Sequence, residues 1–162
     1  MKLIELSRGY FARVSDRDFK RINTLNWCAN VKKRKDRSVK GVYAFHTDHR
    51  TNKTLLMHRF ILGITDSQVE VDHKDHNGLH NERGNLRLAT GQQNKSHSRR
   101  RVDNTSGFKG VHWNARRSKW YASIRAQGKL TYLGSFVRVG DAAKAYDTAA
   151  RRQFGKFAVT NF

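Results

Sequence analysis

The chain has 162 residues, with 33 Lys and Arg against 13 Asp and Glu, which gives a formal net charge of +20. The basic excess is spread over both halves of the chain and is larger than solubility requires, so we expect a polyanionic partner. The only cysteine, Cys28, excludes an internal disulfide and a cysteine-based zinc site, and favours a reducing, cytoplasmic location. The apolar runs are too short for a secretory signal or a membrane span, so we expect nucleic acid rather than a membrane.

Short elements are predicted in the first 65 residues. Residues 7–14 indicate a turn and a strand, after which Ser15 is placed to cap a helix over residues 16–25. The strongly basic run 31–40 is interpreted either as a solvated loop or as a phosphate-contacting one. Two strands are expected at residues 41–46 and 54–57, followed by a short apolar helix at residues 58–63.

The segment 69–94 carries the most informative pattern. Val69 and Val71 alternate as in a strand that ends at Asp72 and His73, and residues 86–89 predict a second strand. Thr90 is then placed to cap a helix that contains Asn94. A strand–loop–strand–helix unit of this kind would bring Asp72 near Asn94, with the loop between the strands beside them.

These residue types suit the hydrolysis of a phosphodiester. His73 is the candidate general base, because the pKa of histidine lies near neutrality. Asp72 and Asn94 offer hard oxygen ligands for one Mg²⁺ or Mn²⁺ ion. Asn85 is expected to hold the loop and to fix the imidazole by hydrogen bonds. An isolated Asp-His pair would more often be a solvated turn, but the whole ordered set in a basic chain favours catalysis.

The same segment resembles the HNH endonucleases, in particular their asparagine-containing branch in phage and intron-encoded homing enzymes. The resemblance rests on Val71-Asp-His73, Gly78, Asn81, Asn85-Leu-Arg87 and Gln93-Asn94, with Leu56-Met-His-Arg59 as a similar lead-in. It implies a ββα-metal nuclease with one divalent ion on Asp72 and Asn94, His73 as the general base and Asn85 as its positioning partner.

Some residues depart from this pattern. Glu82 stands where the branch often has Arg, and His76 and His80 add imidazoles that the pattern does not require. A zinc site assembled from these two histidines with His73 and His97 is an alternative, although the ligand spacing is unlike that of usual zinc sites. For His97 alone, a solvated or phosphate-contacting role is the favoured interpretation.

A basic, aperiodic segment, residues 96–105, predicts a linker, and a small α+β unit follows it. Alternating runs predict strands near residues 109–113, 120–125 and 130–136, and an alanine-rich helix is expected over residues 139–154. The helix would cover the apolar sheet face, with Trp120 in the core, and would leave the other face free. The expected DNA contacts on that face, in its turns and in the linker are Lys109, His112, Tyr121, Ser123, Arg125, Tyr132, Arg116, Arg117, Lys129, Arg99, Arg100 and Arg101.

Residues 106–162 resemble the plant ethylene-response-factor DNA-binding domain, of APETALA-two type. The resemblance rests on Ser106-Gly-Phe-Lys-Gly-Val111, Lys119-Trp-Tyr-Ala-Ser-Ile124, Tyr132-Leu-Gly-Ser-Phe136, Ala142-Ala-Lys-Ala-Tyr-Asp147 and Asn161-Phe162. It implies a three-stranded sheet that enters the major groove. Lys109 and His112 replace usual arginines and Ser123 replaces a usual acidic residue, so the plant site preference does not carry over.

The sequence therefore predicts an α+β protein: an HNH nuclease module over residues 1–95 with an N-terminal strand and helix extension, a linker over residues 96–105, and a DNA-binding domain over residues 106–162, built as a three-stranded antiparallel sheet packed on one helix. The expected activity is site-specific cleavage of double-stranded DNA by a homing-type enzyme, in the host cytoplasm if the gene is phage-borne; no protein partner is evident. The alternatives are a non-catalytic DNA-binding regulator and, on charge alone, a structural RNA-binding protein.

Overall fold

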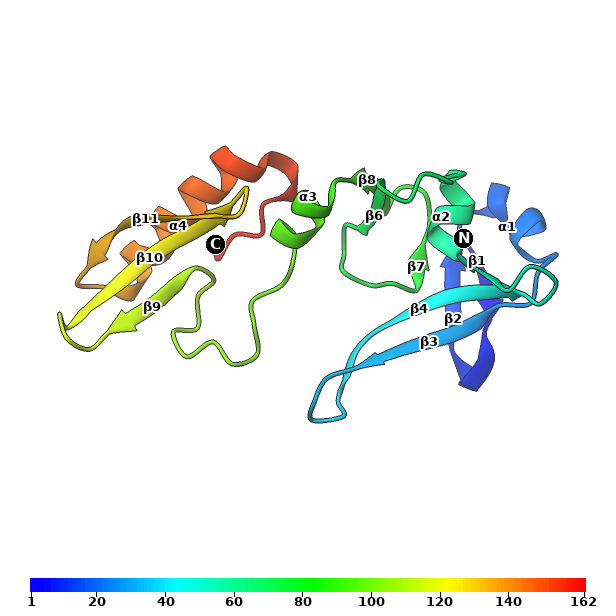
Figure 1. The fold of residues 1–162 in the computed structure, drawn as a ribbon, viewed down its shortest axis with the longest axis horizontal. Coiled ribbons are helices and arrows are strands. Elements are labelled where there is room, and N and C mark those ends of the chain that lie inside the picture. The colour runs from blue at the N-terminus through cyan, green and yellow to red at the C-terminus, as the bar shows by residue number, and fades with distance from the viewer. The chain divides into compact units, whose positions relative to one another are not determined.

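The computed structural model describes all 162 residues and divides into two compact units, Met1–Ala89 and Thr90–Phe162 (Figure 1). It contains three three-stranded sheets, one two-stranded sheet and four α-helices, which confirms the predicted α+β class. None of the helices is long and apolar enough to cross a membrane. The second unit includes the segment 96–105 and the short helix before it, which the sequence patterns set apart from the sheet domain.

The first sheet combines the N-terminus with a segment from the middle of the chain. Strand β1 (Lys2–Glu5) and strand β2 (Phe11–Val14) pair antiparallel around the short 3₁₀ helix η1 (Ser7–Gly9). The two-residue strand β7 (His80–Asn81) adds to β2 in parallel. The amide of Arg13 also donates to the carbonyl of Leu79 at 2.8 Å. The N-terminal hairpin therefore fixes the backbone of the predicted catalytic loop.

Helix α1 (Asp16–Ile22) follows β2 and ends three residues earlier than predicted. Ser15 occupies its N-cap position, but the prediction that its side chain caps the helix is wrong. The Ser15 hydroxyl accepts the amide of Arg83 instead, at 3.1 Å. Arg83 also binds both carboxylate oxygens of the buried Asp18 on α1, at 2.8 and 2.9 Å. Ser15 and Asp18 thus anchor the residue that lies between Asn81 and Asn85.

A second sheet is a meander of β3 (Cys28–Lys33), β4 (Val39–Asp48) and β5 (Lys53–Leu56). The predicted strands at residues 41–46 and 54–57 correspond to β4 and β5. The basic run 31–40 forms the far end of the β3–β4 hairpin, so it is only partly a loop. Helix α2 (Met57–Leu62) follows directly and ends at Gly63 in the left-handed conformation, with a φ of +68°.

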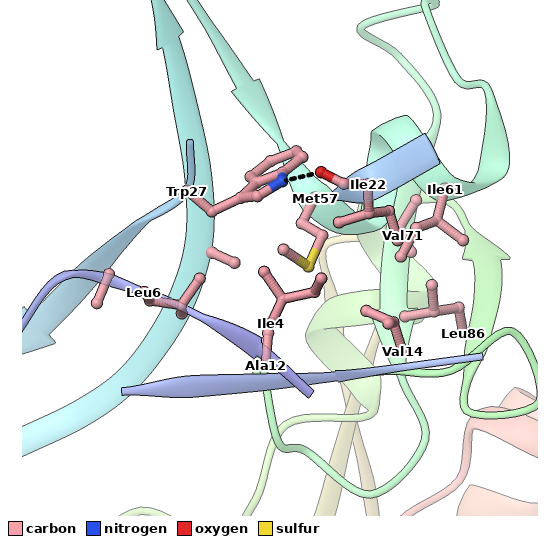
Figure 2. Packing of buried hydrophobic residues seen from close by; sticks show 12 residues of the cluster. Ile4, Leu6, Ala12, Val14, Ile22, Trp27, Met57, Ile61, Val71 and Leu86 are labelled. Carbon is pink, nitrogen blue, oxygen red and sulfur yellow. Dashed lines mark hydrogen bonds between the residues drawn. The ribbon is translucent and has the colours of Figure 1, made fainter. Parts of the chain in front are cut away.

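One apolar core holds these pieces together (Figure 2). Ile4, Val14, Ile22 and Met57 bring together β1, β2, α1 and α2, and each is at most 4% exposed. The indole of Trp27 donates to the carbonyl of Ile22 at 2.9 Å, so the only polar atom of this large side chain is satisfied inside the core. Val71 and Leu86 join from β6 (Glu70–His73) and β8 (Leu86–Ala89).

In the second unit, helix α3 (Gly91–Ser96) precedes a sheet of order β11-β10-β9. Its strands are β9 (Val111–Asn114), β10 (Lys119–Ala126) and β11 (Lys129–Phe136), and both pairings are antiparallel. Helix α4 (Val139–Phe154) covers one sheet face, and the 3₁₀ helix η2 (Gly155–Phe157) follows it (Figure 1). The fully buried alanines of α4 give the predicted close approach: Ala142, Ala143 and Ala150.

The approach of β9 to α4 requires a glycine. Gly110 has a φ of +75°, and a Cβ at this position would clash with the ring of Tyr146 and lie 2.8 Å from the carbonyl oxygen of Ser123. The amide of Ser123 donates to the Gly110 carbonyl at 2.9 Å, so the backbone there is fixed as well. Gly107 also has a positive φ, +78°, but faces open space.

We expect Gly110→Ala to lower the free energy of unfolding of the second unit by roughly 2–5 kcal/mol, because overpacking costs about 1–3 kcal/mol and a left-handed non-glycine residue about 1–2 kcal/mol. Gly107→Ala is the matched control and should lose only the second amount. Hydrogen exchange of the α4 amides, measured under conditions of global opening, reports on this unit. Equal losses in the two variants would mean that the Tyr146 contact contributes nothing.

Candidate active site and nucleic-acid interface

Strand β6 places Asp72 and His73 side by side at its C-terminal end. It pairs antiparallel with β8, so that Asp72 lies opposite Arg87 and His73 opposite Leu86. Val71, Asp72 and His73 are consecutive and all less than 10% exposed, which means that both faces of this short strand are covered. The polar pair is therefore held in a desolvated position rather than in a solvated turn.

The carboxylate of Asp72 is oriented by its cross-strand neighbour. Nε of Arg87 donates to Oδ2 of Asp72 at 2.7 Å, and both side chains are largely buried. A buried carboxylate with a fixed direction is a suitable hard-oxygen donor for Mg²⁺ or Mn²⁺. No group of three or more His, Cys, Asp or Glu side chains is placed to hold a metal ion, so the histidine zinc site has no support here.

The imidazole of His73 is held by Asn81. Its Nε2 lies 3.1 Å from Oδ1 of Asn81, whose side chain is completely buried and donates to the Gly78 carbonyl at 3.4 Å. Because an amide oxygen only accepts, this contact places the proton on Nε2 and leaves Nδ1 as the basic nitrogen. Burial lowers the pKa of His73, while Asn81 and the carboxylates of Asp75 and Asp72 oppose that shift. The ring is thus neutral and able to accept a proton at neutral pH.

Asn85 braces the loop between β6 and β8. Its Nδ2 donates to Asp75 Oδ1 at 2.9 Å and to the carbonyl of His80 at 2.8 Å, and its Oδ1 accepts the amide of Asp75 at 3.2 Å. The loop-holding contacts expected of Asn85 are present. The direct contact to the imidazole, also expected of Asn85, is made by Asn81 instead, because the amide of Asn85 is fully used within the loop.

His80 is a structural member of the same loop. Its Nδ1 lies 2.6 Å from Asp75 Oδ2, and its Nε2 lies 2.6 Å from Glu82 Oε2. Desolvation alone would raise the pKa of Asp75, but hydrogen bonds from the Asn77 amide, His80 and Asn85 outweigh it and lower the pKa to about 2. Glu82 in turn binds Arg13 of β2 at 3.1 Å. His80 and Glu82, two of the three residues that depart from the family pattern, therefore form a connected, loop-stabilising group with Asp75 and Arg13.

Two aromatic rings that the sequence patterns did not select form a wall beside His73. The ring centroid of His58 on α2 lies 5.2 Å from that of His73, nearly perpendicular, and Tyr43 on β4 lies 6.0 Å from His73 and 6.2 Å from His58. A Cβ at Gly78 would clash with the Tyr43 ring and with the carbonyl of Val42, so the loop rests directly on β4. The lead-in Leu56–Arg59 was the one available signal for His58.

His58 is buried and uncharged. It is 7% exposed and its Nδ1 has no hydrogen-bond partner. Burial, and then the proximity of His73 and Arg59, lower its pKa to about 3. The ring therefore packs as a neutral aromatic group against the candidate base.

Helix α3 begins with the predicted cap. The hydroxyl of Thr90 accepts the amide of Gln93 at 3.2 Å, and the side chain of Gln93 accepts the amide of Thr90 at 2.9 Å, which completes a capping box. Asn94 lies in the first turn of this helix, in the second unit, and its use as a metal ligand together with Asp72 stays a prediction. His97 occupies the C-cap position of α3.

The uncovered sheet face carries the predicted polar and aromatic residues. Tyr121 lies opposite His112 and Ser123 opposite Tyr132, and a bulge between Ala122 and Ser123 shifts the register of β11. The rings of His112 and Tyr132 lie 5.7 and 5.2 Å from that of Tyr121, which gives an aromatic row across three strands. Arg125, Arg116, Arg117 and Lys129 are exposed on the strands and turns. Trp120 is half-buried against the core, as predicted.

Lys109 differs from the other expected DNA contacts, because its ammonium donates to the backbone carbonyls of Ser96 and Ser98 within the same unit. A cavity of about 1000 Å³ lies next to it and gathers basic groups from α3, the linker and the sheet. They are Lys95, Arg99, Arg100, Arg101, Lys109 and Arg125. This concentration of cations suits a phosphate backbone.

Comparisons with known proteins give one informative relative. No family model matches the chain. An uncharacterized HNH endonuclease of Acanthamoeba polyphaga mimivirus is 36% identical over 110 residues, which cover 65% of this chain. The matched segment is 56% of that relative, so the chain is similar to little more than half of its length.

The buried His58 predicts a specific sensitivity to acid. Its pKa is about 3 in the folded state and about 6.5 in an unfolded chain, so below pH 6.5 the unfolded state binds more protons. The contribution of His58 to the free energy of unfolding is therefore fully present above pH 6.5 and falls by about 1.4 kcal/mol per pH unit as the pH decreases toward 3. His58→Phe should reduce this slope, whereas His49→Phe, at an exposed turn, should leave it unchanged. Urea unfolding between pH 4.5 and 8 measures both slopes, and parallel curves for wild type and His58→Phe would contradict the assignment.

Proposed function

We propose that the chain is a metal-dependent DNA endonuclease of the HNH type. The observation that carries the proposal is the buried, neutral His73, which is held through Nε2 by Asn81 and stands beside the fixed carboxylate of Asp72. The name of the mimivirus relative supports the same reaction class. The net charge of +20 suits a polyanionic substrate.

In the proposed reaction, Nδ1 of His73 accepts a proton from a water molecule while the oxygen of that water attacks the scissile phosphorus. The new phosphorus–oxygen bond replaces the bond to the leaving sugar oxygen, which takes a proton from solvent. Asp72 and Asn94 are the proposed ligands of one Mg²⁺ or Mn²⁺ ion, which when bound would neutralise charge on the phosphate and the leaving oxygen. Asn81 keeps the imidazole in the tautomer in which Nδ1 carries no proton. Asn85 holds in place the loop that carries Asp75 and His80.

The second unit is proposed to select the DNA site. The uncovered face of β9–β11 offers side chains that could reach base edges, while the arginines of the linker offer charge to phosphates. Such a division of labour supports a site-specific, homing-type enzyme that acts on double-stranded DNA, as the sequence resemblance implies. The aromatic row of His112, Tyr121 and Tyr132 provides a stiff surface for this contact.

Cleavage of supercoiled plasmid DNA tests the proposed reaction. The wild-type protein should nick or linearise DNA that carries its site with Mg²⁺ present, and a chelator should stop the reaction. His73→Ala should lower the cleavage rate at least a hundredfold, because a general base contributes roughly 10²–10⁴-fold, and should leave DNA binding nearly unchanged. His49→Ala, at an exposed histidine in the same unit, is the control and should cut normally. Cutting by His73→Ala within tenfold of wild type would remove His73 from the mechanism.

Competition binding over a randomised site library tests the proposed division between reading and anchoring. Arg125→Ala should relax the preference at one or two base positions, because a bidentate contact to a base contributes roughly 1–3 kcal/mol of discrimination. Arg100→Ala should weaken binding to all sequences alike and lower the salt dependence by roughly one ion. If Arg125→Ala instead lowers affinity uniformly, the outer sheet face is a phosphate-binding surface and does not read bases.

A further inference from the structure

The side chain of Lys109 is directed into its own unit. Its Nζ donates to the carbonyl of Ser96 at 2.8 Å and to the carbonyl of Ser98 at 2.6 Å, and the residue is only partly exposed. Ser96 is the last residue of α3, and Ser98 lies at the start of the arginine-rich segment. Lys119 on β10 and Lys129 on β11 are, by contrast, exposed.

The end of a helix is a favourable place for an ammonium group. The last carbonyls of α3 have no partner within the helix and form the negative end of its dipole. Lys109 reaches one of them, the carbonyl of Ser96, from another element, and so satisfies it and compensates that partial charge. Its second acceptor, the carbonyl of Ser98, lies one residue beyond the C-cap His97. Burial lowers the pKa of Lys109 to about 8, in keeping with an ammonium group that is partly withdrawn from water.

The backbone of Lys109 is fixed independently of its side chain. Asn161 accepts the amide of Lys109 at 2.7 Å and donates to its carbonyl at 3.2 Å. Asn161 is itself bound, through its amide and its side chain, to Asp147 of α4, which is 1% exposed. The backbone of Lys109 is therefore fixed to α4 through Asn161 and Asp147. Its ammonium group in turn links the end of α3 to this fixed backbone.

We propose that Lys109 is a positioning residue that fastens the end of α3 and the start of the arginine segment to the DNA-reading sheet. This inference rests on the proposed function, because α3 carries Asn94, the predicted metal ligand. With the clamp closed, Asn94 and the sheet belong to one rigid body, so the scissile phosphodiester lies at a fixed distance from the bases that are read. Lys109, which matches a DNA-contact position by resemblance, is then not a reader of bases.

Amide hydrogen exchange without DNA tests the clamp directly. The amides of His97 and Ser98 donate to Gln93 and Lys95 in the last turn of α3 and report on its opening. Lys109→Met keeps the aliphatic stem and removes the ammonium, and it should accelerate the exchange of these two amides at least tenfold. Lys109→Arg should restore most of the protection, and Lys119→Met, an exposed lysine on the same sheet, should have no effect. Unchanged exchange in Lys109→Met overturns the proposal.

Mapping of the cut positions on DNA with a fixed recognition sequence tests the consequence. The wild type should cut at one or two phosphodiesters, and Lys109→Met should spread the cuts over several neighbouring positions with unchanged base preference. A relaxed preference at one base with unchanged cut positions would make Lys109 a reader and overturn the proposal. If the wild type cuts no DNA at all, the proposed function fails, while the exchange experiment still decides whether the clamp exists.

A measurement on the wild-type protein covers the case in which Lys109→Met does not fold. The ammonium protons of an exposed lysine exchange too fast to be seen by NMR near neutral pH, whereas a hydrogen-bonded, half-buried ammonium is protected. The wild type should therefore show a ¹H–¹⁵N ammonium signal that disappears in Lys109→Arg. Absence of such a signal in the wild type at pH 6 and low temperature would contradict the clamp.

Discussion

The hydrogen bond between His73 and Asn81 is the contact on which the candidate site depends. It fixes the ring, its tautomer and the direction of its basic nitrogen. Asn81 is itself held in place by its backbone, because it belongs to β7, which pairs with β2. A side-chain contact in the site is thus set by main-chain pairing with the N-terminal hairpin.

The first 65 residues therefore hold the candidate site in place and also pack around it. Strand β4 supplies Tyr43 and the surface on which Gly78 rests, helix α2 supplies His58, and helix α1 supplies the Asp18 that binds Arg83. Each of these elements meets the loop at a different point. The β6–β8 hairpin has only four residues per strand. It could not by itself cover His73 on both sides, and the N-terminal elements complete that enclosure.

Local patterns in the sequence predict much of this arrangement. Residues that act through their own element, such as the capping Thr90, the strand-ending Asp72 and His73 and the alanines of α4, follow from periodicity and side-chain chemistry. The strands of the C-terminal sheet follow from alternation, and Tyr132 lies opposite Ser123 on the face expected for it. The bulge between Ala122 and Ser123 was not predicted. The α+β class follows from the same reasoning.

The residues that could not be predicted are those whose role comes from distant partners. Asn81 belongs to the motif, but a two-residue parallel strand leaves no periodic signal. That Asn81 rather than Asn85 contacts the imidazole could therefore not be predicted from the sequence. Ser15 is a residue type that commonly caps helices, but its hydroxyl accepts the amide of Arg83, which is distant in sequence, and not an amide of α1. Lys109 is basic and lies on a strand-forming segment, which favours a DNA contact, and only the position of the end of α3 reveals its two carbonyl acceptors.

The pairing of β7 with β2 also has a kinetic meaning. Arg13 and His80 meet in register although most of the first unit separates them along the chain, so the loop that they close is long and its closure is entropically costly. Hairpins such as β3–β4 need only local contacts and can form earlier. We therefore expect the loop around Asn81 to order late during folding. A nascent or partly unfolded chain would then carry its basic charge while its imidazole is still unpositioned, so the proposed hydrolytic activity would arise only with the completed fold.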